Sequence, residues 1–331
     1  MRAALLVEPR RIELCEIPPP APGSGEVLIR LVRAGICGSD LSFFDGHREA
    51  HYPHLLGHEL VGRVVATADD VAGFATGARV IVEPNYPCGT CALCRSGRSS
   101  ICPEKKSMGV DLPGCFAKYA VAPARFVWAL PDSISDEDGA TIEPLAVALH
   151  ALDQSRASEG DSVAVVGCGG IGQLLIHAAR ARGVRVLADD QSEAKLERAR
   201  QLGAITTARG TDTARLWREM EVSAVFECAG SSSAVERAID AAPRGGKVLL
   251  LGLSSSLASF VPLHLVRKGV RIEPSLIYDH PVDFARAIDL VAEGTLHPSC
   301  VVSSAFPFDE IGHAFEVACA GPESKVHSLI L

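Results

Sequence analysis

The chain has 331 residues, which is enough for about two domains and a large hydrophobic core. Its 40 Asp and Glu residues outnumber its 32 Lys and Arg residues, so its net charge is −8. This balance argues against proteins that bind nucleic acids or anionic membranes, because both classes need basic patches.

Neither of the two apolar segments that could serve as targeting signals predicts export or membrane insertion. The N-terminal sequence MRAALLVEPR reaches Glu8 and Pro9 after too few apolar residues for a signal peptide. The stretch from Val248 to Val266 lacks Asp, Glu, Lys and Arg, but glycine, serine, proline and histidine interrupt it, which favours a strand, a loop and a helix start. We therefore expect a cytoplasmic protein.

Residues 1 to about 148 are rich in glycine and proline and contain short runs of valine and isoleucine. Strands are expected at Val27–Val32, Leu60–Ala66 and Arg79–Glu83. Such runs between turn-forming residues are typical of a β-rich domain with long loops.

This first region also contains candidate ligands for a catalytic metal. Cys37 lies in GICGSD, His58 and Glu59 lie in LLGHELVG, and Glu143 lies in TIEPLAVALH. A catalytic zinc takes about three protein ligands and keeps one exchangeable position, which Cys, His and one Glu would satisfy. No spacing here identifies a metal site, and taken alone Cys37 is more simply a core cysteine and His58 a loop histidine.

Four of the 11 cysteines crowd into one short segment, where Cys88, Cys91, Cys94 and Cys102 form C-x2-C-x2-C-x7-C. Four thiolates in one loop fit a tetrahedral zinc with no open position, which is a structural site. An iron–sulfur cluster and uncoordinated thiols are the alternatives.

From about residue 160 the pattern changes to apolar runs that alternate with helical segments, as in a parallel sheet covered on both faces. Strands are expected at Val163–Val166, Val184–Ala188, Ala224–Cys228, Val248–Leu251 and Val270–Leu276, and helices at Ile171–Arg182, Glu193–Leu202, Ala234–Ala242, Leu263–Lys268, Asp283–Glu293 and Asp309–Ala320.

The sequence VAVVGCGGIG places Gly167, Gly169 and Gly172 in GxGxxG spacing between a buried strand and a helix. The first glycine allows a tight turn, the second lets a pyrophosphate approach the backbone, and the third lets the helix pack close to the strand. Gly170 and Ile171 open that helix, whose N-terminus offers N–H groups to the phosphates. This pattern predicts a dinucleotide site.

Asp190 ends the next strand, 18 residues after Gly172. An acidic residue at this position meets the adenosine ribose hydroxyls and repels a 2′-phosphate, so NAD is favoured over NADP. Lys195 weakens this preference slightly. The alternative is a structural glycine turn with a capping aspartate.

These motifs together resemble the medium-chain, zinc-dependent alcohol and polyol dehydrogenase family. The resemblance runs through GICGSD, GHELVG, the four-cysteine loop, IEPLAVALH, GCGGIG, FECAG, GGKVLLLG and FPFDEIGHAFE. Within the family, IEPLAVALH looks most like the sorbitol (L-iditol) and threonine dehydrogenase branch.

The resemblance assigns roles to individual residues. It makes Cys37 and His58 ligands of a catalytic zinc, Glu59 a direct or near ligand, and Glu143 an alternate or water-mediated ligand. Ser39 matches the hydroxyl that begins the proton relay. Cys88, Cys91, Cys94 and Cys102 match the structural zinc lobe, so two zinc ions per chain are expected.

One position departs from the family pattern, because Ser42 stands where a relay histidine is common, five residues after the zinc cysteine. Protons would then leave through ribose hydroxyls, water, His47 or His51. His150 lies seven residues after Glu143 on an expected helix, where packing or support of Glu143 are the two roles to consider.

The resemblance implies an α/β protein with a GroES-like catalytic domain at 1–148, a Rossmann domain at 149–278, and a segment at 279–331 that completes the catalytic domain. It also implies a homodimer or homotetramer. The expected activity is NAD-dependent oxidation of a secondary alcohol on a polyol, sugar or (amino)cyclitol to the ketone. An L-threonine 3-dehydrogenase and a non-catalytic NAD-binding protein are the alternatives.

Overall fold

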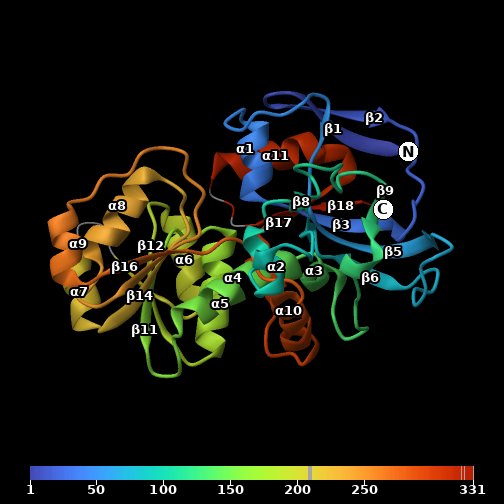
Figure 1. Ribbon diagram of the computed structural model, residues 1–331. Coiled ribbons are helices and arrows are strands. Elements are labelled where there is room, and N and C mark those ends of the chain that lie inside the picture. Colours follow the sequence, from blue (N-terminus) through green and yellow to red (C-terminus); the bar gives the residue numbers. More distant parts are fainter. Residues whose placement is uncertain (208–210, 322, 324, 331) are drawn as a thin grey trace. The chain divides into compact units, whose positions relative to one another are not determined.

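The computed structural model describes residues 1–207, 211–321, 323 and 325–330. The chain forms two compact units, Met1–Glu143 with Ile288–Leu331 and Pro144–Ala287. Each unit is built on its own large sheet (Figure 1). Among the described residues, no helix combines the length and the apolarity that a bilayer crossing needs.

The Pro144–Ala287 unit contains a six-stranded sheet in the order β13-β12-β11-β14-β15-β16, and all neighbouring strands are parallel. The strands are β11 (Ser162–Val166), β12 (Arg185–Asp189), β13 (Ile205–Thr206), β14 (Val222–Glu227), β15 (Lys247–Leu250) and β16 (Arg271–Pro274). The helices that lie wholly or mostly in this unit are α4 (Ile142–Ser155), α5 (Gly170–Ala181), α6 (Glu193–Gln201), α7 (Thr213–Glu219), α8 (Ser232–Ala241), α9 (Pro262–Lys268) and α10 (Val282–Ala292).

The apolar composition of these strands explains this sheet. Every residue of β11 is buried, and its two neighbours in the sheet are β12 and β14. Helix α5 packs on β11 and β12, while α8 packs on β14 and β15. All the strands and helices that the sequence pattern predicts in this unit are present, and the chain adds α7 and the short strand β13.

The other unit contains a seven-stranded, mainly antiparallel sheet in the order β10-β6-β5-β3-β18-β17, with β9 paired to β3. Two small sheets, β2-β1-β4 and β7-β8, accompany it. The strands are β1 (Arg2–Glu8), β2 (Arg11–Glu16), β3 (Glu26–Ile36), β4 (His54–Leu55), β5 (Glu59–Thr67), β6 (Arg79–Val82), β7 (Asn85–Tyr86), β8 (Lys106–Ser107), β9 (Tyr119–Pro123), β10 (Val127–Ala129), β17 (Ser304–Pro307) and β18 (Val326–Leu329). Its helices are α1 (Gly38–Phe44), α2 (Ala92–Arg95), α3 (Asp136–Gly139) and α11 (Ile311–Ala320), with 3-10 turns at Ser99–Ile101, Ala124–Phe126, Pro298–Val301 and Phe308–Glu310.

Segments from both ends of the chain close the core of this unit. Phe315 of α11 packs on Phe44 of α1 and on Phe116, with ring centroids 5.2 and 5.4 Å apart. Each ring is buried, so the contacts add to the stabilisation from burial of apolar area. Strand β18 lies between β3 and β17, which places the chain's last strand beside the strand that leads to Cys37.

Candidate active site

The structure brings Cys37, His58 and Glu59 together, with one ligand atom of each within 4.8 Å of the others. Cys37 follows β3 and is the N-cap of α1. Glu59 begins β5, which pairs with β3 so that Glu59 lies opposite Gly35. Two neighbouring antiparallel strands therefore place the thiol beside the imidazole and the carboxylate.

Glu143 lies in the first turn of α4 and is buried. It is close enough to act electrostatically on His58 and Lys325. It is not a member of the group within 4.8 Å, so the geometry favours Glu59 as the third ligand and Glu143 as a nearby second carboxylate.

The buried carboxylate of Asp40 supports this group. It accepts hydrogen bonds from the backbone N–H of Cys37 at 2.9 Å and of Gly57 at 3.1 Å, and Oδ1 lies 3.6 Å from Nδ1 of His58. Nε2 of the same ring lies 3.4 Å from the hydroxyl oxygen of Ser39. The imidazole thus turns Nδ1 toward an acid, as metal-binding histidines usually do with the nitrogen that does not bind the metal, and it turns Nε2 toward Ser39.

The electrostatics of this pair follow from burial and proximity. Burial alone would lower the pKa of His58, but Asp40 and Cys37 raise it well above its ordinary value. Burial raises the pKa of Asp40, and His58 opposes that rise. In the metal-free chain the two groups therefore stabilise each other's charged forms.

A buried lysine completes the surroundings of Glu59. Nζ of Lys325 donates hydrogen bonds to the carboxylate of Glu59 and, at 3.1 Å, to the carbonyl of Ile36. Burial alone would lower the pKa of Lys325, but Glu59, Cys37 and Glu143 together raise it above its ordinary value, so the ammonium form is stable. A Cβ on Gly35 would lie 2.1 Å from a Glu59 oxygen, so a glycine is needed opposite this pair.

The residues present fit a zinc ion. Thiolate, imidazole and carboxylate are the three donor types that zinc binds in catalytic sites, and Asp40 supplies the outer carboxylate that orients a histidine ligand. Cys37, His58 and Glu59 would hold the ion, and a fourth position would be left for substrate or water.

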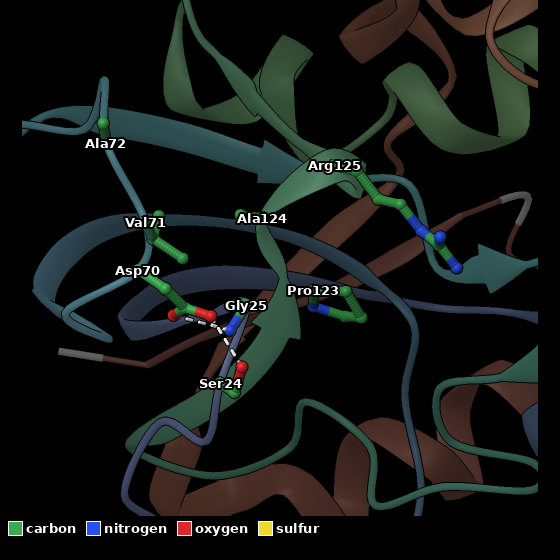
Figure 2. Close-up of a pocket in the computed structure, with 8 residues that line it drawn as sticks. All are labelled: Ser24, Gly25, Asp70, Val71, Ala72, Pro123, Ala124 and Arg125. Carbon is green, nitrogen blue, oxygen red and sulfur yellow. Dashed lines mark hydrogen bonds between the residues drawn. The ribbon is translucent and has the colours of Figure 1, made fainter.

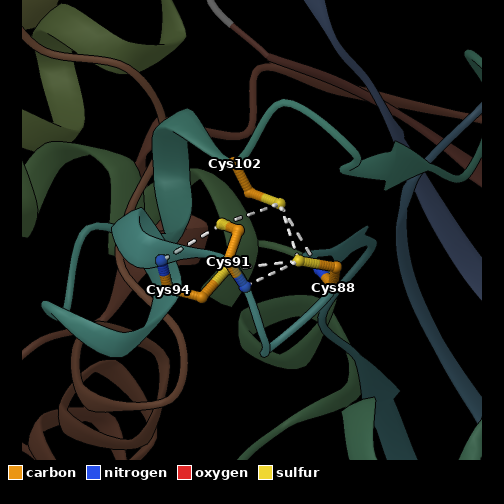
Figure 3. A group of neighbouring side chains, drawn as sticks. All are labelled: Cys88, Cys91, Cys94 and Cys102. Atoms are coloured by element: carbon orange, nitrogen blue, oxygen red, sulfur yellow. Dashed lines mark hydrogen bonds between the residues drawn. The ribbon is translucent and has the colours of Figure 1, made fainter.

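The four cysteines Cys88, Cys91, Cys94 and Cys102 form a second group (Figure 3). Their Sγ atoms are 3.6 Å apart for Cys88 and Cys102, and 4.0 Å apart for Cys88 and Cys94 and for Cys91 and Cys102. A tetrahedral zinc with about 2.3 Å bonds has sulfur atoms about 3.8 Å apart. The cluster fits a structural zinc.

Backbone groups of the same loop point at these sulfur atoms. The N–H groups of Cys88, Cys91 and Cys94 lie 3.4 Å from the sulfur atoms of Cys102, Cys88 and Cys91. N–H donors of Thr90 and Cys91 lower the pKa of Cys88 to about 6. These donors favour the thiolate of Cys88, whereas burial and the sulfur of Cys91 raise the pKa of Cys94 to about 12, so that thiol would lose its proton only on binding a metal.

In the other unit, the glycine turn has the shape that its spacing predicts. Gly167 has a φ of +95°, and a Cβ on it would lie 2.6 Å from the backbone nitrogen of Ala229. A Cβ on Gly172 would lie 2.0 Å from the carbonyl of Gly167. Gly169 is the N-cap of α5 with no side-chain cap, and open space surrounds its Cβ position. A phosphate could approach here, and Gly170 and Ile171 form the first helical turn.

Asp190 lies beside this turn, directly after β12. Its carboxylate accepts hydrogen bonds from the backbone N–H of Cys168 and of Ser192, both at 2.7 Å. Lys195 lies in the first turn of α6, near Cys168. The acid therefore lies at the turn where a ribose would follow the phosphates.

Two further groups of polar residues lie outside the predicted zinc and dinucleotide sites. His150 bonds Asp283, with Nδ1 and Oδ2 2.7 Å apart, and the same oxygen accepts the N–H of Asp279. A surface cavity of about 470 Å³ lies beside Asp70, whose carboxylate accepts bonds from Ser24 and Gly25 (Figure 2). Both acids thus already bind neighbouring groups of the chain.

Comparison with known proteins adds the decisive observation. Residues 23–132 match the model of the alcohol dehydrogenase GroES-like domain, and residues 170–293 match that of the zinc-binding dehydrogenases. The chain is 31% identical to sorbitol dehydrogenase of Bacillus subtilis (strain 168) over 331 residues, which cover 96% of this chain and 93% of the relative. The chain belongs to the medium-chain, zinc-dependent alcohol and polyol dehydrogenase family.

Two further relatives agree with this membership. L-Threonine 3-dehydrogenase of Aeromonas salmonicida (strain A449) is 32% identical over 327 residues, covering 95% of each chain. A solved alcohol dehydrogenase of Escherichia coli CFT073, complexed with NADH, has a TM-score of 0.92 at 27% identity and covers 99% of each chain. The predicted family and the predicted GroES-like and Rossmann folds are confirmed, and this dehydrogenase is an enzyme that acts on alcohol groups.

Sequence reasoning missed Asp40 and Lys325. Asp40 had a local signal, because it lies three residues after Cys37 in the quoted motif GICGSD, where it caps α1. Lys325 had no local sequence signal, because only the pairing of β18 with β3 brings this residue to Glu59.

Proposed function

We propose that this dehydrogenase oxidises a secondary alcohol of a polyol, sugar or (amino)cyclitol to the ketone with NAD. The observation that carries the proposal is the group of Cys37, His58 and Glu59 within 4.8 Å, which provides three zinc ligands in a family of zinc-binding dehydrogenases. Similarity to sorbitol dehydrogenase supports the polyol class.

The chemistry needs two groups that these residues would bind. A zinc ion lowers the pKa of a bound hydroxyl, and the nicotinamide accepts the hydride. Asp40 faces Nδ1 of His58 and would hold the orientation of that ring. Ser39 lies 3.4 Å from that ring, where its hydroxyl can take the substrate proton and pass it on. Because Ser42 stands where the family often has a relay histidine, the proton would pass from Ser39 to ribose hydroxyls, water, His47 or His51.

Two carboxylates near one ligand group suit a substrate with several hydroxyls. Glu59 lies among the ligands, and Glu143 lies close by as a second acceptor. A neighbouring hydroxyl of a polyol can donate a hydrogen bond to one carboxylate while the reacting hydroxyl occupies the open position. The preference for NAD over NADP follows from Asp190, because its carboxylate repels a 2′-phosphate.

We further propose two zinc ions per chain, one held by the four cysteines and one catalytic. The first unit would carry out catalysis, and the second would bind the dinucleotide. The cytoplasmic location stays a prediction.

A second copy of the chain is the proposed partner. Strand β16 is an edge strand, and α9 beside it has no buried residue. Val266 of α9 is 77% exposed and Leu257 before it is 95% exposed. Exposed apolar side chains next to an open sheet edge favour a symmetric dimer. Light scattering should show a dimer or tetramer, and Val266→Asp should shift it toward the monomer.

The decisive experiment follows nicotinamide reduction with NAD and with NADP at alkaline pH. Sorbitol, inositols, an amino-cyclitol, L-threonine and a simple alcohol are compared, each with and without a chelator. Chelator-sensitive activity on a polyol or cyclitol supports the proposal. Activity confined to L-threonine contradicts the proposal. No activity on any of these substrates, in a chain that binds two zinc ions, would favour a non-catalytic NAD-binding protein.

A further inference from the structure

A second cavity, of about 550 Å³, lies in the unit that holds the proposed zinc sites and contains none of their ligands. Its walls come from β1, from α1, from the chain between α1 and β4, and from the loop that follows β8. Its volume is in the range of cavities that bind small molecules. We refer to it below as the Arg48 pocket.

Two walls of the Arg48 pocket lead directly to the proposed catalytic site. Phe43 lies on α1 one helical turn after Ser39, so the two side chains share a helix face and lie about 6 Å apart along its axis. Leu55 ends β4, three residues before His58. A sugar-sized molecule whose reacting hydroxyl lies beside Ser39 can therefore extend its far end into this pocket.

Arg48 is held against one wall of the pocket. Its guanidinium lies over the ring of Phe43, with Cζ 4.5 Å from the ring centroid, which is a cation–π contact. The same ring packs on His54, with centroids 5.1 Å apart, and Nε2 of His54 lies 3.0 Å from the carbonyl oxygen of Gly109. The backbone N–H of Arg48 donates to the carbonyl of Ser42 at 3.0 Å. These contacts place the cation at the pocket and leave its N–H groups available.

No carboxylate of the described residues pairs with the guanidinium of Arg48. Glu49 and Asp111 line the same pocket, but neither forms an ion pair with it. The carboxylate of Asp111 instead accepts the backbone N–H of Ser107 at 2.9 Å. Arg48 is also exposed, so a molecule that enters the pocket can reach it.

The chemistry of these side chains fits one class of ligand. The planar fork of an arginine matches two oxygens of a carboxylate or a phosphate. The carboxylates of Glu49 and Asp111 can accept hydrogen bonds from hydroxyl groups, but they repel an anion that carries none. The pocket therefore favours a molecule that has one acidic group and several hydroxyls.

We propose that the Arg48 pocket binds the anionic end of the substrate, so that this dehydrogenase acts on an acidic derivative of a polyol or sugar. A carboxylate or phosphate of the substrate would supply the partner that Arg48 lacks. This inference rests on the proposed function, because it places the reacting hydroxyl at the Cys37 site. Arg48 is then a specificity-determining residue, which binds the substrate away from the reacting atoms.

The test compares neutral and anionic ligands that share one carbon skeleton. Sorbitol, mannitol and galactitol are each compared with the corresponding hexonate and hexitol phosphate. Binding to the zinc-loaded enzyme with NADH is measured by calorimetry, and turnover with NAD is measured by nicotinamide reduction. In at least one series, an anion should bind about tenfold more tightly than its neutral polyol, or more. This advantage should shrink as salt is added, because the site is exposed. The preferred anion distinguishes a sugar acid from a sugar phosphate.

Arg48→Gln removes the charge but keeps N–H donors. It should reduce the preference for the anion over its neutral polyol by about tenfold or more, mainly through KM, because the contact is made before and during the reaction. Arg48→Lys keeps the charge and should retain part of the preference.

Arg125→Gln is the matched control. The guanidinium of Arg125 also lies over a phenyl ring, that of Phe126, with Cζ 4.9 Å from the centroid, and Arg125 lines the cavity beside Asp70. Because this cavity holds none of the proposed catalytic residues, the variant should leave binding, KM and the preference for the anion unchanged.

The outcomes separate this inference from the proposed function. If every anion binds no better than its neutral polyol, or if the preference is the same in folded Arg48→Gln, the inference is overturned and the proposed function is unaffected. If the zinc-loaded enzyme oxidises none of these compounds, the proposed function is contradicted. Calorimetric binding of an anion that depends on Arg48 would still support the assignment of the pocket.

Discussion

The two candidate zinc sites of this dehydrogenase are built in opposite ways. The four-cysteine site draws all its ligands from Cys88 to Cys102, and its loop also supplies the N–H groups that contact sulfur. The Cys37 site joins residues from two strands and depends on Asp40 and on Lys325 near the other end of the chain. The first site is a property of one loop, whereas the second is a property of the fold.

This difference implies that the four-cysteine site contributes to stability and the Cys37 site to catalysis. Four thiolates close the coordination of a zinc ion, so the loop site can only hold structure together. Three mixed ligands would leave one position open to substrate or water. Disturbing the two sites should therefore have different consequences.

The largest expected effect comes from Cys37→Ser. Loss of one zinc ligand should reduce kcat/KM by about 10³-fold or more, since metal catalysis contributes several kcal/mol. Metal analysis should show about one zinc fewer per chain, with the thermal midpoint little changed. Cys300→Ser, at an exposed cysteine, is the control. Full activity in Cys37→Ser would contradict the assignment of catalysis to the Cys37 site.

Cys91→Ser should give the opposite pattern. The cysteine loop would lose its metal, and the thermal midpoint should fall by several degrees, which corresponds to a loss of about 2 kcal/mol or more. The fraction that remains folded should keep its KM. If kcat fell as far as in Cys37→Ser while the midpoint stayed constant, the loop would have to be assigned a catalytic role.

Asp40→Asn probes the support of the active site. The amide cannot accept hydrogen bonds from both Cys37 and Gly57 in the same way and loses the charge that faces Nδ1 of His58. Zinc affinity or activity should fall by about 10- to 100-fold, the usual effect of an outer partner of a histidine ligand. Asp70→Asn, which also removes an acid with two local bonds, should leave both unchanged.

The smallest effect concerns His150, which sits with Asp279 and Asp283 in a third group of potential metal ligands. Burial alone would lower the pKa of His150, but Asp283, together with Asp279 and Asp153, raises it above its ordinary value. The ion pair therefore stabilises the fold fully below the unfolded-state pKa of about 6.5, and this contribution is lost as pH rises through the higher folded-state pKa.

His150→Gln should accordingly lower the thermal midpoint most below about pH 6.5 and less at alkaline pH, with zinc content unchanged. His313→Gln, at a mainly exposed histidine beside Glu316, should show no such dependence. A drop in zinc content in His150→Gln would instead make this group a metal site.

The same contrast explains what the sequence could predict. The cysteine loop and the turn from Gly167 to Gly172 were predictable, because spacing along the chain determines their local geometry. The choice between Glu59 and Glu143 was not, because both carboxylates follow plausible motifs and only strand pairing places Glu59 beside Cys37. The contact of Lys325 with Glu59 was not predictable for the same reason, since no motif in the sequence around Lys325 indicates it.

The position of β18 also bears on the order in which the protein is made. The unit with the proposed zinc sites consists of two separate stretches, and β18 follows the whole Pro144–Ala287 unit in the chain. On the ribosome, the parallel sheet can be completed while β3 still lacks its neighbour β18. Glu59 meets Lys325 only after β18 emerges, so a nascent chain has no assembled active site until the segment that follows the parallel sheet has been made.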